Sequence, residues 1–139
     1  MSDAIYHDAI VALARDASAA GALDAPQATA TVDNPLCGDR VAVDLAFEGE
    51  RISALRHRVR GCLLCQASAA ALAIAAVGAT REDLRAGTAS LAALLKDGAP
   101  LPAGRFAPFA AFAPLARHRS RHDCAKLPLL AAEKALGTT

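Results

Sequence analysis

The feature that most constrains this fold is a period-two pattern of hydropathy over residues 40–60. Apolar side chains alternate with small or acidic ones over 40–47, and the apolar ones are Val41, Val43, Leu45 and Phe47. This pattern predicts a strand with one buried face, because successive side chains of a strand point to opposite sides. Glu48-Gly49-Glu50 predicts a short hairpin turn, followed by a second strand over 51–60. Two antiparallel strands are marginal alone, so helices must cover their apolar face.

The predicted second strand has two chemically different faces. Leu55, His57 and Val59 share the apolar face, so we interpret His57 as a packed core histidine. The opposite face is expected to meet water or an acidic partner, because it carries Arg56, Arg58 and Arg60.

Four further segments have helical patterns. Residues 4–20 predict an amphipathic helix that ends at Gly21, and 22–36 lack periodicity. Residues 62–77 carry no charge and predict a buried helix, too short to span a membrane. Thr80 is a candidate N-cap for a helix to about Lys96, which we expect Gly87 to split. A last helix is predicted from Asp123 to about Leu136, with Pro128 in about its first turn, where proline is tolerated.

The segment 97–116 is rich in proline, which forbids one long helix there. Its phenylalanines Phe106, Phe109 and Phe112 are spaced three apart. We expect them to form one face of a short helix that packs on the core.

Length and composition narrow the class of protein. The 139 residues predict one domain, 1–139, and the acidic start argues against a secretory signal, so the expected location is cytoplasmic. A net charge of +1 argues against a nucleic-acid partner, and no apolar run reaches the roughly 18 residues of a membrane span. Ala supplies 37 of the residues, so the core is thin and a bound metal would help to stabilise it.

The chain has four cysteines, Cys37, Cys62, Cys65 and Cys124, each at or near the boundary of a predicted element. In a cytosolic protein, metal binding or catalysis is favoured over disulfides, and burial of four small thiols is the alternative. Asp39 could add an oxygen ligand on the same side as Cys37. The Cys62–Cys65 spacing alone could also indicate a redox site, but such motifs follow a parallel strand rather than a hairpin. Cys65 by itself could be a core residue.

Three motifs carry a family resemblance. They are Asn34-Pro35-Leu36-Cys37-Gly38-Asp39, then Gly61-Cys62, then Cys124-Ala125-Lys126-Leu127-Pro128. In this order, over about residues 5–136, the sequence resembles the IscU/SufU/NifU N-terminal family of iron–sulfur cluster assembly scaffolds. The resemblance implies an α+β fold in which a small antiparallel sheet, of two to three strands, is covered by helices.

The resemblance also implies a site and partners. Cys37, Asp39, Cys62 and Cys124 would hold a transient iron–sulfur cluster or Zn²⁺, with Cys65 as a further candidate ligand. A cysteine desulfurase would deliver persulfide sulfur to Cys124, Cys62 or Cys65, and apo-proteins would receive the cluster. The SufU-like branch fits best, because 78–116 resembles the longer stretch that this branch has between its second and third cysteines.

The sequence departs from the family pattern at several positions. The stretch Pro114-Leu115-Ala116-Arg117-His118-Arg119 replaces the motif recognised by an Hsp70-type chaperone, so we expect no such partner. Asp123, not histidine, precedes the last cysteine, and His122 is a less favoured candidate to reach the metal. Cys65 stands where serine or alanine is usual, and could complete a four-cysteine site or relay a persulfide. The arginines of 117–121 could flank the site, or simply form a solvated surface.

Three functions remain open at this point. The first is a scaffold that accepts sulfur, binds iron and transfers a cluster, a carrier rather than a turnover enzyme. The second is a zinc-dependent persulfide sulfurtransferase that feeds a separate scaffold. The third is a metal-stabilised interaction domain without transfer chemistry.

Overall fold

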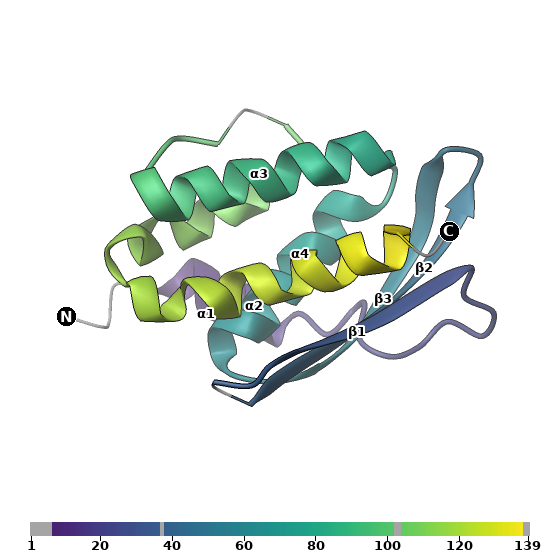
Figure 1. The fold of residues 1–139 in the computed structure, drawn as a ribbon, viewed down its shortest axis with the longest axis horizontal. Coiled ribbons are helices and arrows are strands. Elements are labelled where there is room, and N and C mark those ends of the chain that lie inside the picture. The colour runs from purple at the N-terminus through teal and green to yellow at the C-terminus, as the bar shows by residue number, and fades with distance from the viewer. Residues whose placement is uncertain (1–6, 37, 102–103, 138–139) are drawn as a thin grey trace.

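The computed structural model describes residues 7–36, 38–101 and 104–137 (Figure 1). Three strands and four α-helices, with two 3₁₀ helices before the last, follow one another along the chain. In order they are α1 (Asp8–Arg15), β1 (Ala28–Asn34), β2 (Asp39–Glu48), β3 (Arg51–Arg60), α2 (Leu63–Ala76), α3 (Arg81–Asp97), η2 (Ala107–Arg117), η3 (Arg119–Arg121) and α4 (His122–Gly137). The expected α+β class, with a small antiparallel sheet covered by helices, is confirmed.

The sheet has the order β1-β2-β3, and both pairings are antiparallel. The β2–β3 hairpin lies where the alternating pattern predicts it. Strand β1 corrects the expectation that 22–36 is irregular. Its inward residues Ala28 and Ala30 are buried while Thr29 and Thr31 are exposed. The alternation is present, but alanine and threonine differ little in hydropathy, so the pattern is weak.

The outer face of the sheet is more covered than predicted. Ala42 and Asp44 of β2 are buried, although they point away from the helices. The chain between α1 and β1 crosses this side, and the Leu23 amide donates to the Asp44 carboxylate at 3.1 Å. Arg58 therefore does not simply meet water: its two terminal nitrogens donate to Asp44 at 3.0 and 3.1 Å.

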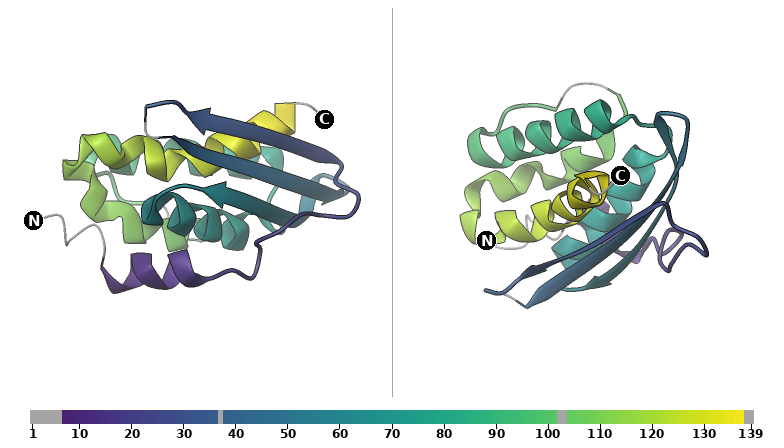
Figure 2. Two further views of the ribbon diagram at one scale, coloured as in Figure 1. Left: turned by 90° about the horizontal axis from the view of Figure 1, so that it is seen from below. Right: turned by 45° about the vertical axis from the view of Figure 1, so that its right-hand side comes forward.

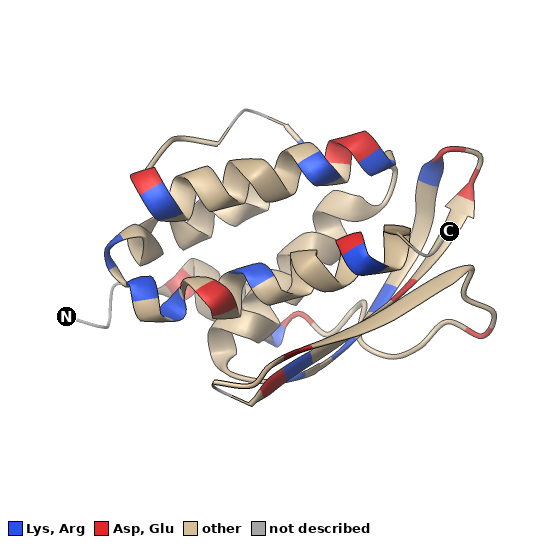
Figure 3. Cartoon of the chain, viewed as in Figure 1, with Lys and Arg blue, Asp and Glu red and all other residues tan. Residues whose placement is uncertain are grey.

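The helices lie on the other face of the sheet (Figure 2). α4 packs against β1 and β2, α2 against β3, α1 and α4, and α3 lies outside, against η2 and α4. α2 carries no charged residue (Figure 3) and is buried along most of its length. None of the helices in the described residues is long and apolar enough to cross a membrane.

Gly87 does not split the helix that begins after Thr80. α3 opens with a capping box, in which the Thr80 hydroxyl and the Asp83 carboxylate each accept from the other residue's backbone N–H. It then continues unbroken to Asp97. A Cβ at Gly87 would lie 2.1 Å from the Phe106 ring, so the glycine allows close packing there.

The proline-rich segment forms η2, an unusually long 3₁₀ helix, on whose inner side Phe109, Phe112 and Leu115 are buried. A 3₁₀ helix has three residues per turn, so residues spaced three apart share one face. This matches the expected docking of the phenylalanines. Pro128 corrects another expectation, because it lies beyond the first turn of α4 and lacks the N–H that would bond to the Cys124 carbonyl.

Candidate metal centre

Three predicted ligands come together at one end of the molecule. The ligand atoms of Asp39, Cys62 and Cys124 all lie within 4.8 Å of one another. They come from the start of β2, the N-cap of α2 and the first turn of α4. Within 7–36, 38–101 and 104–137, this is the one group of three or more potential metal-binding side chains at such distances.

The turn between β1 and β2 positions Asp39. The Asn34 side-chain oxygen accepts from the Leu36 amide at 3.1 Å, and its carbonyl accepts from the Gly38 amide at 2.8 Å. Gly38 has φ of +75°, in the left-handed region that favours glycine. Asn34 and Asp39 are then paired across the strands. The motif Asn-Pro-x-Cys-Gly-Asp thus encodes a tight turn that delivers the carboxylate to the site.

The Asp39 side chain is buried with an unsatisfied oxygen. Asp39 is 5% exposed, and its Oδ2 has no hydrogen-bond partner among the described residues. A buried carboxylate oxygen without a partner is costly, since its hydration is lost without compensation. A cation bound between Asp39 and the two thiols would supply the missing interaction.

Gly61 makes room for Asp39, a role that the sequence analysis did not assign to it. A Cβ at this position would lie 2.9 Å from Asp39 Cγ and 3.0 Å from Oδ1, so only glycine leaves the carboxylate its space. The sequence analysis gave Gly61 only as a motif residue beside Cys62. Its place directly before Cys62 was the available signal, but the clash partner lies 22 positions away in the sequence.

Both cysteines of the group lie at helix starts. Cys62 is the N-cap of α2, partly exposed, and its carbonyl accepts from the Gln66 amide at 3.1 Å. Cys124 is 3% exposed in the first turn of α4. Helix N-termini favour thiolates, because their N–H groups and macrodipole stabilise negative charge. Two cysteine sulfurs and one carboxylate at this spacing are a donor set that suits zinc or iron–sulfur chemistry.

The other residues considered for the site are Cys37, Cys65, His122 and the arginines of 117–121. Cys37 lies outside the described residues, so its part in the site stays a prediction. Cys65 is fully buried in the hydrophobic core and does not belong to the three-residue group. His122 is also outside the group, and its Nε2 lies 2.7 Å from the Leu115 carbonyl oxygen. The arginines of 117–121 precede α4, Arg119–Arg121 forming η3.

Comparison with known proteins gives consistent matches. The family model of the NifU-like N terminal domain matches residues 5–107, a range that includes Asp39 and Cys62 but ends before Cys124. The crystal structure of a nitrogen-fixing NifU-like protein (N-terminal) from Brucella abortus is 34% identical, with a TM-score of 0.92 over 97% of this chain and 94% of that one. No curated protein matches the chain.

Two more distant structures share the fold. One is a putative iron–sulfur cluster assembly scaffold protein for the SUF system from Fervidobacterium islandicum, 22% identical, with a TM-score of 0.89 over 98% of this chain and 99% of that one. The other is a hypothetical protein, 21% identical, with a TM-score of 0.85 over 99% of both chains. The arrangement of sheet and helices is therefore common to all three solved structures.

Proposed function

Because this chain belongs to the NifU-like N-terminal domain family, we propose that it is a scaffold on which iron–sulfur clusters are assembled and from which they are transferred. The observation that carries the proposal is the convergence of Asp39, Cys62 and Cys124, with a buried carboxylate oxygen that has no partner among the described residues. Cys37, two residues before Asp39, is the proposed fourth ligand.

The donor set suits the two tasks of a scaffold, which are to bind a cluster and to release it. Thiolates are soft ligands that bind iron–sulfur clusters, whereas the carboxylate of Asp39 is a hard and more exchangeable ligand. A mixed site can therefore hold a cluster and also open at one ligand for its release. The cluster is the cargo of the protein, and zinc would occupy the same ligands in its absence.

We propose a cysteine desulfurase as the sulfur donor and apo-proteins as recipients. In the transfer step, a thiolate of this chain attacks the terminal sulfur of the donor's persulfide. A new persulfide forms here, and the donor cysteine leaves as a thiolate. Cys124 and Cys62 are the acceptor candidates within the site, and Cys65 is the candidate behind it. Assignment to the SufU-like branch, without an Hsp70-type chaperone, is part of the same proposal; α3 and η2 fill its expected longer stretch.

Anaerobic reconstitution tests the proposal. The purified protein is incubated with ferrous iron and a reductant, and sulfur comes either from a desulfurase with cysteine or from inorganic sulfide. We expect visible absorption from a cluster that moves to an apo-ferredoxin. Cys62→Ser and Cys124→Ser should lose it with either sulfur source. Cys65→Ser is the matched control for thiol number and should retain it with inorganic sulfide.

The same experiment separates the alternatives. A protein that holds zinc and accepts persulfide sulfur, but forms no cluster from either source, would be the zinc-dependent sulfurtransferase. A protein that accepts no sulfur and forms no cluster would be a metal-stabilised interaction domain. Either result would overturn the scaffold proposal.

A further inference from the structure

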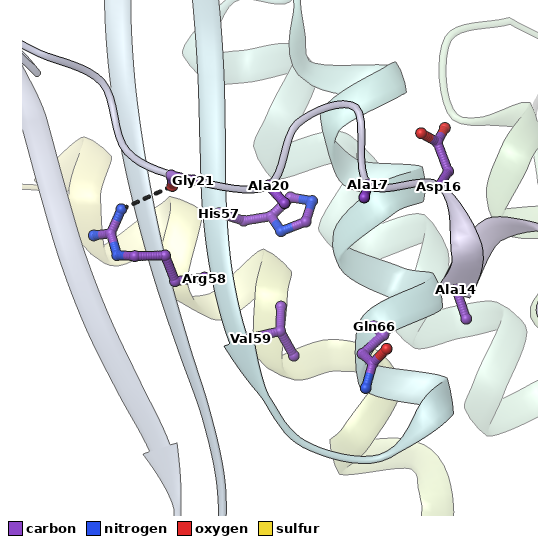
Figure 4. Close-up of a pocket in the computed structure, with 9 residues that line it drawn as sticks. All are labelled: Ala14, Asp16, Ala17, Ala20, Gly21, His57, Arg58, Val59 and Gln66. Carbon is purple, nitrogen blue, oxygen red and sulfur yellow. Dashed lines mark hydrogen bonds between the residues drawn. The ribbon is translucent and has the colours of Figure 1, made fainter.

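A second feature of the molecule lies outside the metal centre. A cavity of about 390 Å³ opens between β3, the start of α2 and the chain that follows α1 (Figure 4). Its volume falls at the small end of the range for small-molecule sites, roughly 300–1,000 Å³. Part of its wall is apolar, formed by Ala14, Ala17, Ala20 and Val59.

The segment after α1, which forms one wall of the cavity, is hydrogen-bonded to β3. Ala20 forms a parallel bridge with His57, and the Gly21 amide donates to the His57 carbonyl at 2.9 Å. The His57 amide donates to the Ala19 carbonyl at 2.9 Å. Arg58 also holds this segment, because its Nη1 donates to the Gly21 carbonyl at 3.0 Å. The cavity is therefore bounded by a hydrogen-bonded segment.

His57 presents an unsatisfied ring nitrogen at this cavity. The residue is 6% exposed, and its Nε2 is buried without a hydrogen-bond partner among the residues that the structure describes. Figure 4 shows the ring projecting from β3 toward Ala20. Burial lowers the pKa of His57, so the ring is neutral near pH 7. A hydrogen bond to its own backbone opposes this lowering of the pKa. In the tautomer that carries its proton on Nδ1, the neutral ring has a lone pair on Nε2 and can accept a hydrogen bond there.

Two further side chains of the cavity, Asp16 and Gln66, present acceptor oxygens. Hydrogen bonds from Ser18 lower the pKa of Asp16, which keeps its carboxylate ionised. The Gln66 amide nitrogen donates to the Gly61 carbonyl at 3.1 Å, which leaves the side-chain oxygen of Gln66 to accept. Arg58 is the donor in the lining, and it is already engaged by Asp44 and the Gly21 carbonyl. A ligand that donates hydrogen bonds and carries a positive charge would match these acceptors and the Asp16 carboxylate.

We propose that this cavity binds a small organic ammonium compound, such as a primary amine with a short apolar body. The ammonium group donates to His57 Nε2, Asp16 supplies the opposite charge, and the apolar body packs on the alanines. A metal ion fits less well, because His57 and Asp16 belong to no group of three ligands within 4.8 Å among the described residues. The inference stands independently of the proposed function.

Calorimetric titration of the full-length protein with L-alaninamide tests the inference. This probe has an ammonium group, a short apolar side chain and no carboxylate. We expect saturable binding that weakens at least about tenfold in Asp16→Asn and in His57→Phe, whose ring fits an apolar face. Asp24→Asn removes an equal charge from the exposed chain before β1 and should bind as the wild type does. N-acetyl-L-alaninamide lacks the cation and should not bind.

Three results would overturn the inference. One is the absence of saturable binding to the folded wild-type protein, which would mean that water alone fills the cavity. Another is equal affinity in Asp16→Asn, a variant at the surface that is not expected to disturb folding. The third is competition by zinc at the Asp39 site, which would place the amine at the metal centre instead.

Discussion

Asp39 lies in closely constrained surroundings in the candidate site. It follows a turn ordered by Asn34, it fills space left by Gly61, and its buried Oδ2 lacks a partner among the described residues. The turn and the space at Gly61 together place the carboxylate within reach of two thiols. A residue that served only to cap the turn would not need to face the cysteines.

Replacing Asp39 should slow the release of a cluster without preventing its binding. Asp39→Ala removes the exchangeable hard ligand and leaves the thiolates, so a reconstituted cluster should persist several-fold longer. The measurement is the rate of cluster transfer to an apo-ferredoxin, followed by circular dichroism. Release as fast as in the wild type would show that Asp39 is a turn residue and not a ligand.

Gly61→Ala should disturb the site without removing any ligand. The added Cβ would overlap with Asp39 Cγ and Oδ1, so the carboxylate must move. Overpacking of this kind typically costs about 1–3 kcal/mol, and we expect zinc affinity to fall about tenfold. Competition with a chromophoric chelator measures the affinity. Gly137→Ala is the matched control, since nothing lies within 4 Å of a Cβ there. Equal affinity in the two variants would contradict the role given to Gly61.

Cys65→Ser tests the thiol behind the site. Cys65 is buried in the core, one helical turn after Cys62. We expect zinc stoichiometry to stay intact, while sulfur transfer from the desulfurase falls. Radiolabelled cysteine reports the transfer, and elemental analysis reports the zinc. Loss of zinc would make Cys65 a primary ligand, and no change in either assay would leave it a core residue. Cys65→Ala repeats the test without a buried hydroxyl.

At the scale of elements, β2 and β3 are joined on their outer face by a polar cluster. Asp44 is buried, and it accepts hydrogen bonds from Arg58, Thr29 and the Leu23 amide. Arg58 contributes most to lowering the pKa of Asp44, with smaller contributions from the other two donors. The cluster ties β1, β2, β3 and the chain that crosses them into one unit.

The lowered pKa of Asp44 predicts a loss of stability in acid. In the unfolded chain the carboxyl has a pKa of about 3.9, so the contribution is fully present above that pH. It declines below that value and disappears as the pH falls through the lower pKa of the folded state. Arg58 is 44% exposed, so we expect a loss of only about 1 kcal/mol.

Urea unfolding at pH 7 and pH 3 measures this contribution. Asp44→Asn should lower the midpoint at pH 7 and show a smaller further drop at pH 3 than the wild type. Asp24→Asn provides an exposed control and should keep the full drop. If Asp44→Asn and the wild type lost equal stability between the two pH values, Asp44 would not be the titrating group.

For the whole molecule, the site joins segments that are distant in the chain. Asp39 begins the second strand, Cys62 begins α2 and Cys124 lies in the first turn of α4. The core that these elements share is rich in alanine, and its largest fully buried side chains include Phe109 and Phe112. A bound metal would therefore cross-link three elements that meet around an alanine-rich core.

Chelation of the zinc-loaded protein should lower the melting temperature. A ligand that binds only the folded state adds about 2.7 kcal/mol at 100 times its Kd. Differential scanning calorimetry before and after metal removal measures the change. Cys62→Ser should melt lower at the outset and respond little to the chelator. An unchanged melting curve after verified removal of the metal would show that the site does not stabilise the fold.

The sequence by itself determined the features that depend on neighbours in the chain. Alternation predicted β2 and β3, the capping pattern predicted the start of α3, and the motifs brought out Asp39, Cys62 and Cys124. These signals are local, because strand periodicity, capping and tight turns act over a few residues. Strand β1 was not predicted, because alternation of alanine with threonine gives little contrast in hydropathy.

Only the tertiary structure decided which distant residues touch. Gly87 was predicted to split a helix, but it makes room for Phe106. Gly61, given only as a motif residue, makes room for Asp39. The cavity at His57 likewise exists because the chain after α1 attaches to β3. A glycine or a histidine has the same local pattern whatever packs on it. Its role depends on close packing between segments far apart in the chain, which no short-range pattern encodes.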